Sequence, residues 1–191
     1  MRLDREFRQN LNQEYSLETL STYVTRSISL AKKDWWDTNQ VPVMSQFTPI
    51  GEHYDPLLIE TVNSHLFQFA SKQNVSIERG NVPNDNRGVW DPTKRRITLR
   101  NDLNRVNSIE VLAHEVAHVA AGHDQYCTDT RPEQEVMAFG ASFLYLHAYG
   151  IDTHGMIAPN IAFYSFISRE HELFFRKKDD IVALVELMMT E

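Results

Sequence analysis

The sequence predicts an α+β fold that is mostly helical and contains a small antiparallel sheet. Segments with the spacing of amphipathic helices come first and last along the 191 residues, and short alternating segments lie between them. Apolar residues make up 42% of the chain and charged residues 24%, which is the composition of a globular protein. The length suits one domain with a small appendage. We therefore expect an N-terminal helical extension and linker over residues 1–54 and the main domain over residues 55–191.

The N-terminal part is expected to hold one helix followed by a linker. Residues 16–34 have helical spacing, and Ser16 is placed to cap the first turn. Residues 35–54 contain two prolines and a glycine among polar side chains, which predicts a loop or linker.

The main domain is expected to begin with a helix over residues 55–73. Asp55 suits the capping position, and Pro56 suits the first helical position. Residues 74–78 alternate as a short strand. Residues 87–100 have the pattern of a hairpin whose turn begins at an Asp-Pro pair. These segments make up the expected sheet.

A further helix is predicted over residues 107–122. Asn107 with Glu110 three residues later resembles a capping box, and Gly122 suits the C-terminal stop. The remaining helices are expected at 133–148, at about 160–176, and from residue 179 or 180 to the end of the chain.

Charge, hydropathy and cysteine content narrow the functional classes. The net charge of −7 does not favour nonspecific binding to nucleic acid. No segment approaches the roughly 20 apolar residues that span a membrane, and the N-terminus lacks the apolar core of a secretory signal. The single cysteine, Cys127, cannot form an internal disulfide, so we expect a cytoplasmic location. The composition leaves the oligomeric state open.

The strongest functional signal is the segment AHEVAHVAAGHD at residues 113–124. His114 and His118 are four positions apart, so a helix stacks them on one face, where both imidazoles can reach one metal ion. Glu115 lies about 100° around the helix from His114. That position suits the general base of the H-E-x-x-H motif. The segment therefore predicts zinc-assisted hydrolysis, in which the metal activates a water and the glutamate takes its proton.

A catalytic zinc takes three protein ligands and keeps an open position, so another ligand is needed. His123 would lie about 140° from His118 on a continuing helix, which is the wrong face. Glu133, in the first turn of the next expected helix, is the better candidate. Small residues later in that helix allow it to pack closely against a neighbour. The expected ligands are His114, His118 and Glu133.

Three segments together resemble the ImmA/IrrE group of zincin metallopeptidases: RGVWDPTKRRITLR, VLAHEVAHVAAGH and EQEVMAFGASFL. The resemblance covers about residues 55–148. It implies a zincin-like, gluzincin-type core in which the two motif histidines bind zinc and Glu115 is catalytic. It also implies Glu133 as the third ligand, with Glu135, which matches the second glutamate of the family, as the fallback.

Known members of this group cleave repressor proteins, so the resemblance implies a zinc-dependent peptidase with a specific protein substrate. A second hypothesis is a non-catalytic zincin-fold regulator or antirestriction-type binding protein of a phage or mobile element. Val136 and Met137 stand where the family usually has Ala-Asn, and this departure permits the second hypothesis. A third is a helical protein whose histidines bind no metal.

The substrate is expected to lie along the hairpin at residues 87–100, because an extended peptide can add to an exposed sheet edge. Hydrolysis also requires a hydrogen-bond donor for the oxyanion of the tetrahedral intermediate. The sequence offers several candidates for this donor without choosing among them: Tyr145, His147, His154, Tyr164 and His171.

Overall fold

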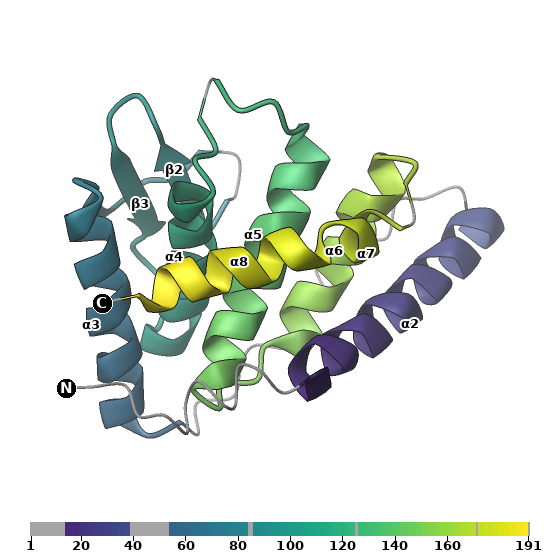
Figure 1. The fold of residues 1–191 in the computed structure, drawn as a ribbon, viewed down its shortest axis with the longest axis horizontal. Helices are drawn as coiled ribbons and strands as arrows, with labels where there is room; N and C mark the ends of the chain where they lie inside the picture. The colour runs from purple at the N-terminus through teal and green to yellow at the C-terminus, as the bar shows by residue number, and fades with distance from the viewer. Residues whose placement is uncertain (1–13, 39–53, 84–85, 125, 171, 191) are drawn as a thin grey trace.

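The computed structural model describes residues 14–38, 54–83, 86–124, 126–170 and 172–190 (Figure 1). They form an α+β fold that is mostly helical with a three-stranded sheet, as predicted. None of the described helices is both long and apolar enough to cross a membrane. The elements are α2 (Glu14–Thr38), α3 (Pro56–Lys72), β1 (Ser76–Gly80), β2 (Gly88–Asp91), β3 (Arg96–Arg100), α4 (Arg105–Ala120), α5 (Arg131–Ala148), α6 (His154–Ile167), α7 (Leu173–Arg176) and α8 (Lys178–Met189).

The start of α3 is as predicted. The Asp55 carboxylate accepts the backbone N–H of Leu57 at 2.9 Å, and Pro56 occupies the first helical position. This arrangement satisfies one of the unpaired N–H groups of the first turn. The prediction for the preceding helix was less accurate, because α2 begins at Glu14 and Ser16 therefore lies inside it.

The predicted cap of α4 was wrong by one turn. Asn104 is the N-cap, and its side-chain oxygen accepts the backbone N–H of Asn107 at 2.8 Å. Asn107 is thus the residue whose N–H is capped. Both positions hold an asparagine, so the pattern alone did not separate the cap from its partner. The predicted segment at 160–176 is also divided, into α6 and the short α7.

The sheet is mixed, which corrects the predicted antiparallel one. Its strand order is β1-β3-β2. β2 and β3 form the predicted antiparallel hairpin, with Trp90 opposite Ile97. β1 instead pairs with β3 in parallel, with Ile77 opposite Ile97. In the described sheet, β3, the return arm of the hairpin, therefore takes the central position.

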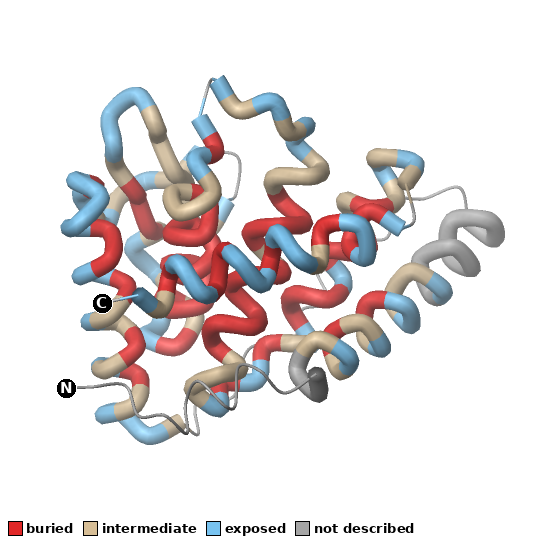
Figure 2. The backbone as a smooth tube through the Cα atoms, viewed as in Figure 1, coloured by how far each residue is buried: buried red, intermediate tan, exposed pale blue. Residues whose placement is uncertain are grey.

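Helix α4 lies at the centre of the molecule. It contacts α3, α5, α8, β2 and β3, and every residue from Ser108 to His118 is buried (Figure 2). Leu112, Ala113, Val116 and Ala117 are within the hydrophobic core. A polar side chain on this helix is therefore removed from bulk water, and it is costly unless it finds a partner.

Helices α8 and α2 pack on the outside of this core. α8 crosses α4 and α5, and it approaches α5 closely because residue 140 is glycine (Figure 1). A Cβ at Gly140 would lie 2.7 Å from Cδ1 of Ile181. α2 packs on α6, and its Leu20 and Val24 belong to the same hydrophobic cluster as α4. The predicted linker falls mostly on residues 39–53, which lie outside the described residues, and the domain boundary at residue 54 stays a prediction.

Candidate metal centre

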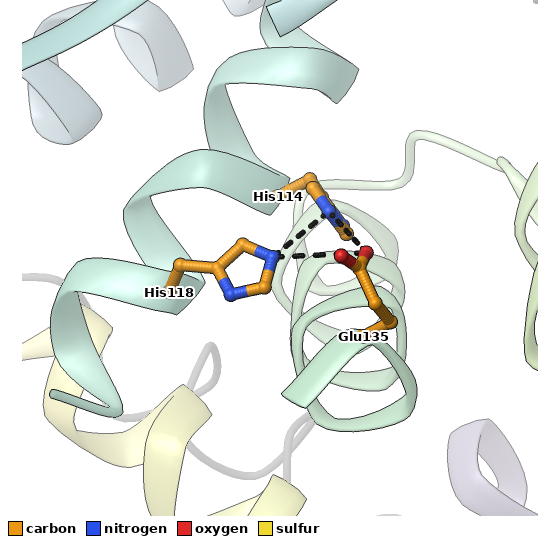
Figure 3. Close-up of side chains that lie close together, drawn as sticks. All are labelled: His114, His118 and Glu135. Carbon is orange, nitrogen blue, oxygen red and sulfur yellow. Dashed lines mark hydrogen bonds and ion pairs between the residues drawn. The ribbon is translucent and has the colours of Figure 1, made fainter. Parts of the chain in front are cut away.

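His114, His118 and Glu135 converge between α4 and α5. The two histidines lie one turn apart on α4, and the glutamate extends from the first turns of α5 toward them (Figure 3). All three residues are buried. We refer to this trio as the metal centre.

The spacing of the three donor atoms fits a zinc ion. Nε2 of His114 lies 3.2 Å from Nε2 of His118 and 3.3 Å from Oε2 of Glu135. The remaining separation, from Nε2 of His118 to Oε2 of Glu135, is 3.8 Å. Donors placed about 2.0–2.1 Å from a tetrahedral zinc are roughly 3.3–3.4 Å apart. Two imidazoles and a carboxylate are also a ligand set that zinc accepts.

The structure places Glu135, and not Glu133, in the centre, which corrects the expected third ligand. Glu133 instead forms a capping box at the start of α5: its Oε2 accepts hydrogen bonds from the Thr130 backbone N–H and hydroxyl, both at 2.7 Å. Its Oε1 accepts from Arg176 at 2.9 Å. These contacts hold its pKa down, from the ordinary 4.5 to about 2. Two residues along a helix correspond to about 200° of rotation, so the two glutamates face opposite sides of α5.

Outer contacts orient the centre. Nη2 of Arg131, one turn before Glu135 on α5, donates to the carboxylate Oε1 at 2.9 Å, which leaves Oε2 directed at the histidines. The ring of His114 lies against Phe139, with 4.1 Å between the ring centroids. Such contacts fix the direction of a ligand and commonly support metal affinity. The sequence analysis did not predict a role for Arg131.

His123 lies beside His118, contrary to the prediction that it would be on the wrong face. The prediction assumed a continuing helix, but α4 ends at Ala120 and Gly122 adopts a positive φ of 65°. The chain therefore turns back, and Nδ1 of His123 lies 2.8 Å from Nδ1 of His118. Trp90 of β2 holds this turn by donating to the His123 carbonyl at 3.1 Å. The predicted stop at Gly122 was the signal that could have indicated this arrangement.

Two opposing influences set the pKa values in the centre: burial disfavours the charged form of each group, and a nearby partner of opposite charge favours it. Burial lowers the pKa of His114. The hydrogen bond to Glu135 and the charge of Glu115 raise this pKa by more than burial lowers it, so the net change is upward. Burial raises the pKa of Glu135, and its bonds to the two histidines outweigh this, so the net change is downward. For His123, burial and the neighbouring His118 lower the pKa to about 4. His123 is therefore a neutral imidazole near neutral pH.

The metal centre opens into a cleft of about 480 Å³ between β2, α4, α5 and α6, and Glu115 lines the same cleft. Gly88 allows β2 to approach α4 here. A Cβ at this position would collide with Cγ1 of Val111 and lie 3.1 Å from Oε1 of Glu115. The other polar side chains along the cleft include Asn86, Arg87, Glu110, His123, Asp124, Arg131, Gln134, Asn160 and Tyr164.

Of the candidate oxyanion donors that lie within the described residues, Tyr164 alone lines this cleft. Tyr145 is buried in the core and is not among the residues that line the cleft. His147 stacks on Phe143, and His154 stacks on Tyr23. His171 lies outside the described residues.

No family model, curated protein or solved structure matches this chain. Its chemistry is therefore what indicates a function. The cleft combines a buried trio of metal-ligand type with the carboxylate of Glu115 and the edge of a sheet.

Proposed function

We propose that this chain is a zinc-dependent metallopeptidase that hydrolyses peptide bonds in a specific protein substrate, such as a repressor or another regulator. One observation carries the proposal. Three donor atoms of zinc-ligand type lie within 3.8 Å of one another, beside a cleft that Glu115 also lines. A structural role alone gives no reason to gather these side chains in one buried place, because buried polar groups are costly.

His114, His118 and Glu135 would hold the zinc ion through Nε2, Nε2 and Oε2. When bound, zinc polarises a carbonyl oxygen and lowers the pKa of a coordinated water. Three protein ligands leave the open position that distinguishes a catalytic site from a structural one. Arg131 keeps the carboxylate directed inward, and the contact with His123 fixes the ring of His118.

Glu115 is the proposed general base. It follows His114 directly on α4 and lines the cleft beside the ligands. Its carboxylate accepts a proton from the attacking water and delivers that proton to the leaving amine nitrogen. Tyr164, which lines the cleft from α6, is the proposed hydrogen-bond donor to the oxyanion that forms at the scissile carbonyl.

An extended substrate segment would pair with β2. This strand is an edge of the described sheet, since β3 is its neighbour on one side and the strand order ends with it. Its residues Gly88, Val89 and Trp90 line the cleft. Main-chain pairing supplies affinity, and side pockets supply specificity, when a peptide adds to a sheet edge.

The first experiment measures metal content by elemental analysis for zinc, manganese and iron together, in the wild type beside His118→Ala. We expect about one zinc per wild-type chain and a clearly lower zinc content in the variant after dialysis, because a catalytic zinc requires all three protein ligands. Metal absent from both proteins after zinc is offered back would overturn the proposal.

The second experiment tests catalysis with a peptide mixture prepared from a whole proteome, in which mass spectrometry detects new termini. Glu115→Gln keeps the size of the side chain and removes its basicity. We expect the variant to keep its zinc and to lose cleavage. Cleavage that persists in the variant contradicts the role of Glu115.

The Glu115→Gln variant also distinguishes the peptidase hypothesis from the hypothesis of a non-catalytic binding protein. Met137 is buried in the core at the position where the related family usually has an asparagine, so it offers the centre no hydrogen bond. A zincin-fold protein that acts only by binding retains both its metal and its biological effect in Glu115→Gln. A peptidase retains the metal alone.

A further inference from the structure

A second group of metal-ligand type lies directly after α4. One ligand atom each from His123, Cys127 and Asp129 lies within 4.8 Å of the others. His123 is buried with 5% of its surface exposed, whereas the other two are half-buried. An imidazole, a thiolate and a carboxylate are all accepted by zinc, and thiolate favours zinc over magnesium or calcium.

Within the described part of the chain, one ring nitrogen of His123 has no hydrogen-bond partner. Nδ1 contacts His118, and Nε2 is buried with no hydrogen-bond partner among the described residues. Buried polar atoms are rarely left unpaired, so such an atom points to a missing ligand. Because Nδ1 is engaged, Nε2 is the nitrogen available to a metal ion.

Asp129 also has an oxygen available. Its Oδ1 accepts from Nζ of Lys177 at 3.0 Å, whereas its Oδ2 lies 3.9 Å from Sγ of Cys127. The ammonium group lowers the attraction of this carboxylate for a second cation. We therefore expect weaker metal binding here than at the metal centre, because solvent screens the charge of Lys177, whose side chain is 10% exposed, less than the charge of Arg131 beside Glu135, whose side chain is 75% exposed.

We propose that His123, Cys127 and Asp129 form a second binding site for a zinc-like divalent metal ion, and that its occupation opposes metal binding at the metal centre. The site does not depend on peptidase activity. It follows from the ligand atoms and from the proton between two histidine rings.

The two sites oppose each other because the hydrogen bond between the two Nδ1 atoms contains one proton, so one ring must donate and the other must accept. A neutral imidazole carries its proton on one nitrogen only. When Nε2 of His118 binds a metal, its proton is on Nδ1 and is donated to Nδ1 of His123, whose own proton then occupies Nε2 and blocks the second site. When Nε2 of His123 binds a metal, both protons shift the other way and Nε2 of His118 is blocked. Filling both sites requires losing a proton or breaking the 2.8 Å contact.

Cobalt(II) gives a direct test. A thiolate bound to this ion produces a charge-transfer absorption in the near ultraviolet, and nitrogen or oxygen ligands do not. Cys127 is the single cysteine of the chain, so this band reports the second site alone. We expect the band when cobalt is added to the full-length protein, and its complete loss in Cys127→Ser with the metal centre still filled.

His123→Asn is the matched variant. Asparagine places an amide near the position of Nδ1, so it can still pair with His118, but it has no equivalent of Nε2. We expect this variant to lose the cobalt–thiolate band although Cys127 is present, and to keep about one zinc at the metal centre. A band that persists in His123→Asn would show a thiolate acting without His123 and would overturn the site.

The coupling is tested with His114→Ala, which empties the metal centre and keeps both His118 and His123. The cobalt dissociation constant at the second site should be lower in this variant than in the zinc-loaded wild type by about tenfold or more. Equal constants overturn the opposition, and absence of the band from both proteins overturns the site itself. Neither result bears on whether the zinc-loaded wild type cleaves peptides, so failure here is distinct from failure of the proposed function.

Discussion

The proposed metal centre and the segment after α4 bring together side chains of metal-ligand type in two different ways. In the centre, all three ligands extend from helices whose neighbours bury them, and outer contacts fix their direction. In the His123–Cys127–Asp129 group, the ligands lie on an irregular segment, and one of them is shared with Lys177. Sites built on helices hold ligands more accurately than sites on loops. We therefore expect a tight, constant site beside a weaker and adjustable one.

The largest expected effect is a loss of zinc affinity when Glu135, but not Glu133, is replaced on α5. Glu135→Gln removes a ligand charge from the centre, and zinc affinity should fall by more than the 10–100-fold that loss of an outer contact costs. Glu133→Gln is the matched control, because it makes the same change two positions away and should leave zinc affinity unaltered. Competition with a zinc chelator measures both. The reverse result, with affinity lost only in Glu133→Gln, would restore the ligand set expected from the sequence.

The next largest effect concerns the hydrogen bond by which Arg131 orients Glu135. Arg131→Met keeps much of the aliphatic length of the side chain and removes the donor to Oε1 of Glu135. We expect zinc affinity to fall by about 10–100-fold, the range found when outer hydrogen bonds to ligands are lost. Arg169→Met, at an exposed residue outside the cleft lining, is the control for loss of positive charge. Equal affinities in all three proteins would mean that the helices alone orient Glu135.

A third effect tests how closely the sheet approaches α4. Gly88→Ala introduces a Cβ that collides with Val111 and crowds Glu115. We expect a loss of about 1–3 kcal/mol in the free energy of unfolding, the cost of overpacking, and reduced peptide cleavage with zinc retained. Gly155→Ala is the control, since a Cβ there meets no heavy atom within 4 Å. Urea denaturation measures both variants, and equal stabilities would contradict the close approach.

The accuracy of the sequence-based predictions depended on how local each feature is. The helix spacing of His114 and His118, the Asp55 cap and the hairpin follow from neighbouring residues, and these were correct. The parallel pairing of β1 with β3 was not predictable, because alternation does not record strand direction.

The choice between Glu133 and Glu135 depended on the rotation of α5 relative to α4. Both glutamates lie in the first turns of α5, and their spacing puts them on opposite sides of it. Arg176, far along the chain, pairs with one of them, and Arg131 pairs with the other. The packing of α5 against α4 therefore decided which carboxylate lies beside the histidines and leaves no local pattern, whereas the Thr130–Glu133 capping box is a local signal that could have assigned Glu133 to the start of the helix.

The smallest expected effect is the contribution of Glu133 to the free energy of unfolding. Glu133 has a pKa of about 2 in the folded protein, below its ordinary 4.5, because Thr130 and Arg176 bind its ionised form. A lowered pKa stabilises the fold above pH 4.5, and the gain is lost as the pH falls from 4.5 toward 2. Since Arg176 is half-exposed and solvent screens the pair, we expect Glu133→Gln to cost only about 1 kcal/mol at pH 7.

Urea denaturation from pH 7 downward checks this pH dependence. The difference between the wild type and Glu133→Gln should shrink below pH 4.5, because the wild-type carboxyl then loses its advantage over the neutral amide. Glu186→Gln removes an exposed carboxylate on α8 and controls for the change in net charge. A difference that stays constant over this range would mean that Glu133 stabilises α5 through its shape and not through its charge. The different roles of Glu133 and Glu135 would then depend on geometry alone.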